Sequence, residues 1–177
     1  MSYQPLLEEQ AIRTRVRELG KQISVDYEGK ELLLVGILKG AFIFMADLIR
    51  QIEVPVTVDF VVVSSYGAST ESSGVVRIEK DLEKGIEGKH VLIVEDIIDT
   101  GLTLNYLKHN LETRGPASVR ICALLDKPSR RKVSVEADYL GFSIADEFVV
   151  GYGLDFAERH RHLPYVAVLS ADEYRQS

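Results

Sequence analysis

The sequence has a single cysteine, no secretory signal and no apolar run long enough to cross a membrane. Cys122 cannot form an internal disulfide, and its place in the apolar run RICALL is typical of a buried structural thiol. A helix that spans a bilayer needs about 20 consecutive apolar residues, so we expect no membrane partner. The N-terminal stretch MSYQPLLEEQ lacks the basic and apolar regions of a signal peptide. These absences predict a cytoplasmic protein.

Positive charge is also scarce. The chain has 21 lysines and arginines against 27 aspartates and glutamates, which gives a formal net charge of -6. An acidic balance argues against a broad nucleic-acid-binding surface, so we expect no nucleic-acid partner. A length of 177 residues with 46% hydrophobic residues is typical of one globular domain. We therefore expect a single domain over residues 1–177.

Hydrophobic periodicity predicts strands that alternate with helices. Residues 6–24 carry apolar side chains spaced like one face of a helix, namely Ile12, Val16, Leu19 and Ile23. Two further helices are predicted over 41–52 and 103–115. Short β-branched runs predict strands at 32–38, 54–65, 91–94 and 118–125, and near 139–144, 147–150 and 166–169. Strand–helix–strand repeats favour an α/β fold with a mostly parallel central sheet flanked by helices.

The stretch HVLIVEDIIDTGLTL (90–104) combines a buried strand with an acidic loop and a helix start. In an open parallel sheet, ligands bind beyond the carboxyl ends of the strands. The backbone N–H groups at the start of the following helix attract anions, and Gly101 lets the backbone come close to a phosphate. Thr100 and Thr103 add hydroxyl donors. The segment therefore predicts a phosphate site without the lysine of a Walker A loop.

Three carboxylates precede this phosphate loop. Glu95 and Asp96 are adjacent in the chain, and such a pair suits the hydroxyl groups of a sugar or a Mg²⁺ ion. Asp99 lies closest to the loop and can accept a proton. The alternative is a solvated acidic turn, but acidic clusters seldom follow an apolar strand and open directly into a helix that begins with Gly and Thr.

VLIVEDIIDTGLTL resembles the phosphoribosyl pyrophosphate (PRPP) signature of the type I phosphoribosyltransferases. Further segments are similar to its hypoxanthine-guanine branch in order and spacing: LKGAFIF (38–44), SSYGAST (64–70), LLDKPSRR (124–131) and DEFVVGYGLDFAERHRHLPY (146–165). The resemblance covers most of the chain. It implies a type I phosphoribosyltransferase fold with a small hood, and a pentosyl-transferring enzyme of purine salvage. Its substrates would be PRPP and a 6-oxopurine, with pyrophosphate as the leaving group.

The resemblance also assigns roles to the acidic loop. It places Glu95 and Asp96 at the ribose hydroxyls and the metal, and Asp99 as general base or acid at purine N7. It places the 5-phosphate on the residues Asp99, Thr100, Gly101, Leu102 and Thr103. An oxocarbenium-like transition state is favoured by nearby carboxylates, and Mg²⁺ neutralises the pyrophosphate.

Other segments supply the pyrophosphate and purine contacts that the resemblance implies. Lys39 and Gly40 match the pyrophosphate loop, in which the Leu38–Lys39 bond is expected to be cis, and Arg161 matches a pyrophosphate-binding arginine. The residues matched to the purine are Lys127 at O6, Phe148 as the stacking ring, Val149 through its backbone, and Asp155, which also matches a metal ligand. From the local pattern alone, Phe148 and Val149 would be core strand residues.

The polar loop YGASTESSG (66–74) has two interpretations. It is either a plain surface loop or a lid over the site. The resemblance favours the lid, because Tyr66 matches a tyrosine that closes over PRPP.

Two rival functions share some of these features. A regulator with the same fold could sense PRPP and bind RNA, but the acidic composition, Asp99 and Lys127 favour catalysis. A phosphoacceptor domain takes its carboxylates from different strands, whereas here all three lie in one loop. The sequence leaves open the preference among hypoxanthine, guanine and xanthine. It also leaves open whether the chain forms the homodimer or the homotetramer that the resemblance implies.

Overall fold

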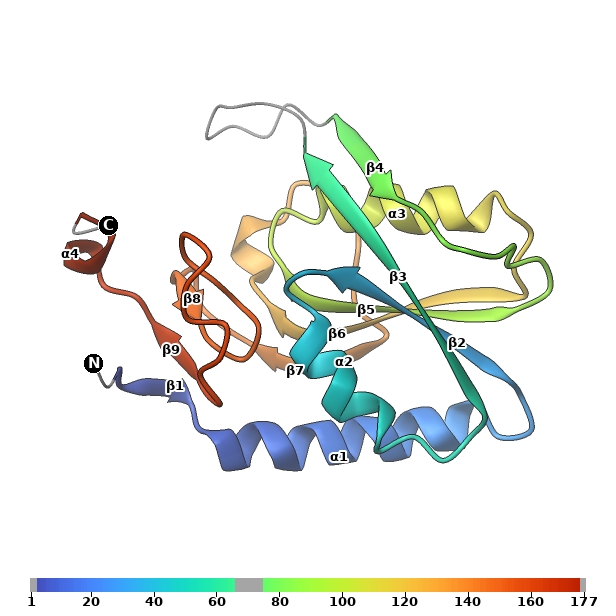
Figure 1. The fold of residues 1–177 in the computed structure, drawn as a ribbon, viewed down its shortest axis with the longest axis horizontal. Coiled ribbons are helices and arrows are strands. Elements are labelled where there is room, and N and C mark those ends of the chain that lie inside the picture. Colours follow the sequence, from blue (N-terminus) through green and yellow to red (C-terminus); the bar gives the residue numbers. More distant parts are fainter. Residues whose placement is uncertain (1–2, 66–74, 176–177) are drawn as a thin grey trace.

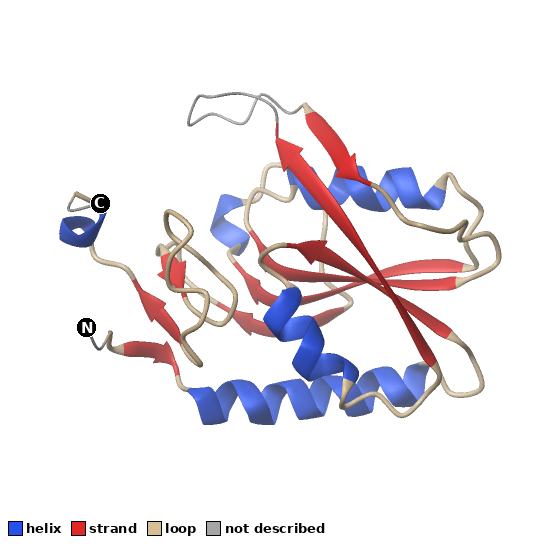
Figure 2. Cartoon of the chain, in the orientation of Figure 1, coloured by secondary structure: helices blue, strands red, loops and turns tan. Residues whose placement is uncertain are grey.

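A six-stranded sheet runs through the middle of the molecule in a computed structural model that describes residues 3–65 and 75–175 (Figures 1 and 2). The strand order is β4-β3-β2-β5-β6-β7. The strands are β2 (Leu32–Leu38), β3 (Val56–Ser65), β4 (Val76–Lys80), β5 (His90–Ile98), β6 (Ser118–Asp126) and β7 (Tyr139–Ser143). All neighbours are parallel except β3 and β4, which pair antiparallel. The α/β fold with a mostly parallel sheet is confirmed.

Helices cover both faces of this sheet. The helices α1 (Glu9–Asp26) and α2 (Phe42–Ile49) lie on one face, and α3 (Leu102–Glu112) lies on the other (Figure 1). In β2 the side chains alternate between the two cores, so that Leu34 packs with the α1 side and Val35 with the α3 side. No helix in the described ranges has the length and apolar character that crossing a membrane requires.

Most apolar side chains on the inner faces of the helices are buried. In α1 and α3 these are Ile12, Val16, Leu19, Ile23, Leu104, Leu107 and Leu111. In α2, however, Phe44 is fully buried while Ile49 and Ile52 are only partly buried. The helix ends at Ile49, earlier than predicted, because the chain turns there toward β3. Cys122 is fully buried in β6, and burial raises the pKa of its thiol.

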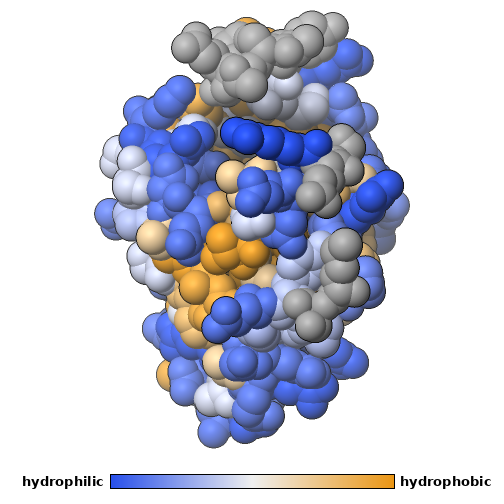
Figure 3. All heavy atoms as spheres, turned by 90° about the vertical axis from the view of Figure 1, so that its left-hand side faces the viewer, coloured by the Kyte–Doolittle hydropathy of each residue, from blue (hydrophilic) through white to orange (hydrophobic). Residues whose placement is uncertain are grey.

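A second, smaller sheet forms the hood that the resemblance implied. Its three antiparallel strands are ordered β1-β9-β8, with bounds β1 (Pro5–Leu7), β8 (Val149–Val150) and β9 (Val166–Val168). The short helix α4 (Ala171–Tyr174) follows β9. Both ends of the chain lie on this side of the molecule (Figure 1). Viewed from there, the surface is largely hydrophilic around an apolar patch (Figure 3).

Candidate active site

A cavity of about 250 Å³ lies at the carboxyl ends of β2 and β5. Its walls include seven of the residues proposed from the sequence, namely Gly40, Glu95, Asp96, Asp99, Thr100, Gly101 and Thr103. They come from the loop after β2, the end of β5 and the start of α3. The fold therefore brings the acidic pair and the predicted phosphate loop together, at the edge of the sheet where parallel strands present ligands.

The phosphate loop needs glycine at position 101 for two reasons. Gly101 immediately precedes α3 with φ of 83°, in the left-handed region that other residues rarely adopt. A Cβ built there would also lie 2.5 Å from Cγ1 of Val135. The loop is tied internally as well, because the N–H of Leu102 donates to Oγ1 of Thr100 over 3.4 Å. The start of α3 thus offers its N–H groups to an anion at this cavity.

The acidic pair is held in place by its own backbone. Glu95 is only 9% exposed, and burial together with the neighbouring Asp96 charge raises the pKa of Glu95 well above its usual range. The N–H of Asp96 donates to Oε1 of Glu95 over 2.9 Å, and the N–H of Ile97 donates to Oδ1 of Asp96 over 2.7 Å. A Cβ on Gly40 would lie 1.8 Å from Oδ2 of Asp96, so glycine lets this carboxylate pack against the loop after β2.

The loop after β2 has the expected geometry, since the Leu38–Lys39 peptide bond is cis. The ammonium of Lys39 lies 3.0 Å from Oε2 of Glu158, and both side chains are exposed. Glu158 belongs to the segment between β8 and β9, so this ion pair joins two loops that are far apart in the sequence. Lys39 is therefore paired with the segment between β8 and β9, and it is not among the residues that line the cavity.

Arg161 lies in the same segment between β8 and β9. Its Nη1 donates to the carbonyl oxygen of Gly153 over 2.7 Å, and its Nη2 lies 3.3 Å from Oδ1 of Asp155. Asp155 also accepts a hydrogen bond from the N–H of Glu158 over 2.9 Å. The Nε of Arg161 is buried and has no hydrogen-bond partner within the described part of the chain. The guanidinium is thus positioned by its own turn.

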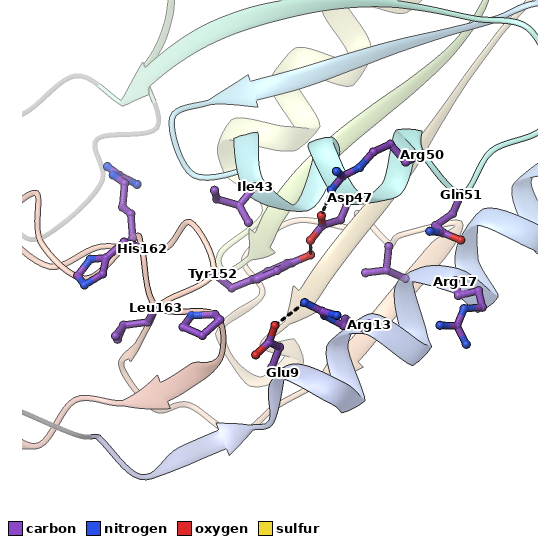
Figure 4. A pocket seen from close by; sticks show the side chains of 13 residues that line it. Glu9, Arg13, Arg17, Ile43, Asp47, Arg50, Gln51, Tyr152, His162 and Leu163 are labelled. Carbon is purple, nitrogen blue, oxygen red and sulfur yellow. Dashed lines mark hydrogen bonds and ion pairs between the residues drawn. The ribbon is translucent and has the colours of Figure 1, made fainter.

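A second, larger pocket of about 650 Å³ lies between α1, α2 and the segment that contains Arg161 (Figure 4). Inside it, the hydroxyl of Tyr152 donates to Oδ2 of Asp47, which also pairs with Arg50 (Figure 4). This bond ties the turn after β8 to α2, the helix that follows the Lys39 loop. Neither Tyr152 nor Asp47 was predicted from the sequence, because the only local signal was an aromatic residue between two glycines.

The proposed purine contacts lie on β6 and the hood. Lys127 follows β6 and is 7% exposed, with its ammonium 3.9 Å from Oδ1 of Asp146. Phe148 keeps 39% of its surface exposed and meets Phe156 edge to face, with 5.6 Å between ring centroids. Val149 is buried in β8, as the local pattern alone would predict. Phe148 is therefore partly exposed and not the core strand residue that the local pattern predicts.

The candidate general base has a cationic neighbour that the sequence did not reveal. Oδ1 of Asp99 lies 3.0 Å from Nε of Arg130, and both side chains are about half exposed. Arg130 also approaches Asp146, with Nη1 at 3.8 Å from Oδ2. The carboxylates of Asp99 and Asp146 therefore have Arg130 and Lys127 as cationic neighbours.

The three expected metal ligands do not form one cluster. Within residues 3–65 and 75–175, no three histidine, cysteine, aspartate or glutamate side chains are placed to hold one ion. Glu95 and Asp96 remain together, whereas Asp155 is engaged by Arg161. The lid prediction for 66–74, with Tyr66, falls outside the described residues.

Comparison with known proteins finds similar sequences over most of the chain. A family model described as the phosphoribosyl transferase domain matches residues 2–157. The chain is 54% identical to hypoxanthine phosphoribosyltransferase of Salmonella typhimurium over 95% of this chain and 96% of that protein. It is also 50% identical to the bifunctional protein TilS/HprT of Listeria innocua, matching 97% of this chain but spanning only 26% of that protein's length.

Solved structures resemble the whole fold. Hypoxanthine phosphoribosyltransferase of Staphylococcus aureus superposes with a TM-score of 0.94 at 51% identity, covering 97% of this chain and 93% of that chain. A hypoxanthine-guanine phosphoribosyltransferase of Bacillus anthracis, with HEPES in its active site, superposes with a TM-score of 0.91 at 48% identity. That match covers 96% of this chain and 100% of the other.

Proposed function

The chain belongs to the phosphoribosyltransferase family, and from that premise we propose that it transfers the 5-phosphoribosyl group of PRPP to N9 of hypoxanthine, guanine or both. The products are IMP or GMP and pyrophosphate, as in purine salvage. The observation that carries the proposal is the cavity in which the acidic pair, the candidate base Asp99 and the start of α3 meet.

The two ends of PRPP bind to different loops in this proposal. The 5-phosphate lies on the loop from Asp99 to Thr103, where helix N–H groups and hydroxyls favour an anion. The pyrophosphate lies against Lys39, Gly40 and Arg161. The contact between Gly40 and the Asp96 carboxylate supports this arrangement, because it joins the pyrophosphate loop to the acidic pair.

Bond breaking at the ribose leaves a positively charged, oxocarbenium-like centre. A positive charge beside Glu95 opposes the burial that raises its pKa and favours its ionised form. The carboxylates of Glu95 and Asp96 then stabilise the developing charge and accept hydrogen bonds from the ribose hydroxyls. Asp99 takes the proton from N7 of the purine as N9 attacks. Its half-exposed side chain is compatible with this role, since a purine can reach it from the solvent.

The purine is recognised by β6 and the hood. The ammonium of Lys127 donates to O6 of a 6-oxopurine, the ring of Phe148 stacks on the base, and the backbone of Val149 contacts its edge. Asp155 lies in the segment after β8 and completes the purine side. The burial of Lys127 supports its role, because a desolvated ammonium discriminates strongly between acceptors and donors.

The residues present also fit a Mg²⁺ ion held together with the substrate. Mg²⁺ is usually bound by one or two carboxylates plus substrate phosphates, and Glu95 and Asp96 supply such a pair, with Oδ2 of Asp96 directed at the Gly40 loop. When bound, the ion neutralises charge on the leaving pyrophosphate.

We also propose that the enzyme is cytoplasmic, that it forms a homodimer or homotetramer, and that Tyr66 closes over PRPP.

An absorbance assay tests this function directly. The chain is mixed with PRPP, Mg²⁺ and either hypoxanthine, guanine, xanthine or adenine, and nucleotide formation is followed. We expect turnover with hypoxanthine or guanine that depends on PRPP and Mg²⁺. A gel shift with RNA is run beside it. If no purine is turned over and RNA shows a PRPP-dependent shift, the proposal of an enzyme is wrong and the protein is a regulator of the same fold.

A further inference from the structure

Residues 131–135, which follow β6, pack against one side of the phosphate loop and form what we call its support. Nη1 of Arg131 donates to the carbonyl oxygen of Asp99 over 2.8 Å, while its Nη2 lies 2.6 Å from Oδ1 of Asp126. The side chains of Arg131 and Asp126 are only 17% and 15% exposed. A largely buried arginine thus links the end of β6 to the backbone of the candidate general base.

The same support contacts the next two residues of the loop. The N–H of Lys132 donates to the carbonyl oxygen of Thr100 over 2.9 Å. A Cβ on Gly101 would lie 3.0 Å from Cδ of Arg131 and 2.5 Å from Val135. Three consecutive loop residues are therefore held from one side by residues 131–135.

These contacts fix the direction of the loop amides. In a planar trans peptide, the carbonyl oxygen and the following N–H point in opposite directions. The carbonyls of Asp99 and Thr100 both point at the support, so the N–H groups of Thr100 and Gly101 point away from it. Donors fixed in this way bind an anion without the cost of first ordering the loop.

We propose that Arg131 is a positioning residue for the 5-phosphate of PRPP, held in turn by Asp126. The inference rests on the proposed function, since it takes the loop from Asp99 to Thr103 as the phosphate site. Arg131 acts through the backbone of Asp99, unlike Arg130, which contacts the carboxylate of the same residue. The removal of Arg131 should therefore weaken binding at the phosphate end and leave the rest of the site intact.

The test compares Arg131→Gln with Arg114→Gln. Arg114 makes a two-pronged ion pair with Asp81, at 2.8 and 3.1 Å, and does not line the candidate site, so it controls for the loss of an arginine–aspartate pair. For Arg131→Gln we expect the KM for PRPP and the calorimetric Kd for IMP to rise about tenfold or more, the range for a lost charged hydrogen bond. The Kd for pyrophosphate and the KM for hypoxanthine should stay within about twofold. Arg114→Gln should change none of these constants.

A double-mutant cycle tests the part played by Asp126. If Asp126 only holds Arg131, Asp126→Asn raises the KM for PRPP, and the double variant is no worse than Arg131→Gln alone. Arg131→Lys keeps the charge but has fewer donors, so its KM for PRPP should lie between those of the wild type and Arg131→Gln. This variant replaces Arg131→Gln in the test if the Gln variant does not fold. Equal losses for PRPP and hypoxanthine, or an unchanged Kd for IMP, would overturn the proposal. A wild type that neither binds IMP nor turns over would instead refute the proposed function.

Discussion

Gly153 packs so closely on Gly40 that a Cβ built on Gly153 would lie 2.4 Å from the Gly40 carbonyl oxygen. This contact joins the turn after β8 to the loop after β2. The carbonyl of Gly153 also accepts the hydrogen bond from Nη1 of Arg161. The Lys39 loop and Arg161 are both proposed to bind pyrophosphate. Their relative position therefore depends on the close contact between the backbones of Gly153 and Gly40.

Gly153→Ala should damage the pyrophosphate end of the site. Gly153 has φ of 99°, so alanine is strained there, and its methyl would displace the Gly40 loop. We expect the KM for PRPP to rise about tenfold, equivalent to about 1.4 kcal/mol. The control is Gly29→Ala, with φ of 76° and nothing within 4 Å of its Cβ. Thermal unfolding should show a loss of stability in both, and a rise in KM shared by the control would contradict the prediction.

Asp99→Asn should impair chemistry more than binding. Asparagine keeps the shape and can still accept the hydrogen bond from Arg130, but it cannot take a proton from N7. General acid–base catalysis contributes roughly 10²–10⁴-fold in rate, so kcat should fall by about that factor. Calorimetry should show a much smaller change in PRPP affinity, since Glu95 and Asp96 remain. Equal losses of turnover and affinity would assign Asp99 to binding.

Lys127→Gln should narrow the preference for 6-oxopurines over adenine. The lysine ammonium offers only donors, which match the 6-oxo group and oppose the 6-amino group of adenine. An unmatched buried polar group costs about 1–3 kcal/mol, more beside a charge. In the wild type, kcat/KM should therefore be far higher for hypoxanthine or guanine than for adenine. The glutamine amide has both a donor and an acceptor, so the ratio should shrink. If the ratio of kcat/KM between 6-oxopurines and adenine is unchanged in the variant, the backbone near Val149 discriminates between these bases instead of Lys127.

Tyr27→Phe should make the protein less sensitive to alkaline pH. Burial is the main cause that raises the pKa of Tyr27 to about 12 in the folded state, against about 10 in an unfolded chain. Folding therefore favours the protonated phenol, so this stabilisation is complete below about pH 10 and is lost as the pH rises toward about 12. Urea unfolding at several pH values should show a shallower decline in the variant. The control is Tyr106→Phe, whose side chain is exposed on α3.

Local sequence patterns predicted the acidic loop and the strands of the central sheet except β4, for which no strand was predicted. The spacing of Ile12 and Val16 predicts one face of α1, and the apolar run before Glu95 predicts a buried strand. Each pattern could be recognised because it reflects the burial of its own segment. The hood was harder to foresee. β8 has only two residues, too few for any periodicity, and the three C-terminal strand predictions gave no sign that they divide between two sheets.

The contacts that align the site could not be read from the sequence. The bond from Tyr152 to Asp47 joins residues 105 positions apart, and the bond from Arg131 to Asp99 joins residues 32 apart. Neither side chain stands out locally, since a tyrosine between glycines and one arginine of a pair are common surface features. Such contacts arise only when the sheet places the ends of distant strands side by side.

The pairing in the hood sets the order in which the site can be completed during synthesis. β9, near the C-terminus, hydrogen-bonds both β1, near the N-terminus, and β8, which directly follows Phe148. A chain emerging from the ribosome can form the phosphate loop of α3 while β9 is still inside the exit tunnel. It cannot form the hood, because β1 and β8 have no partner until β9 emerges. The proposed purine-stacking surface is therefore among the last parts to assemble, and a nascent chain interrupted before β9 would carry the phosphate loop without it.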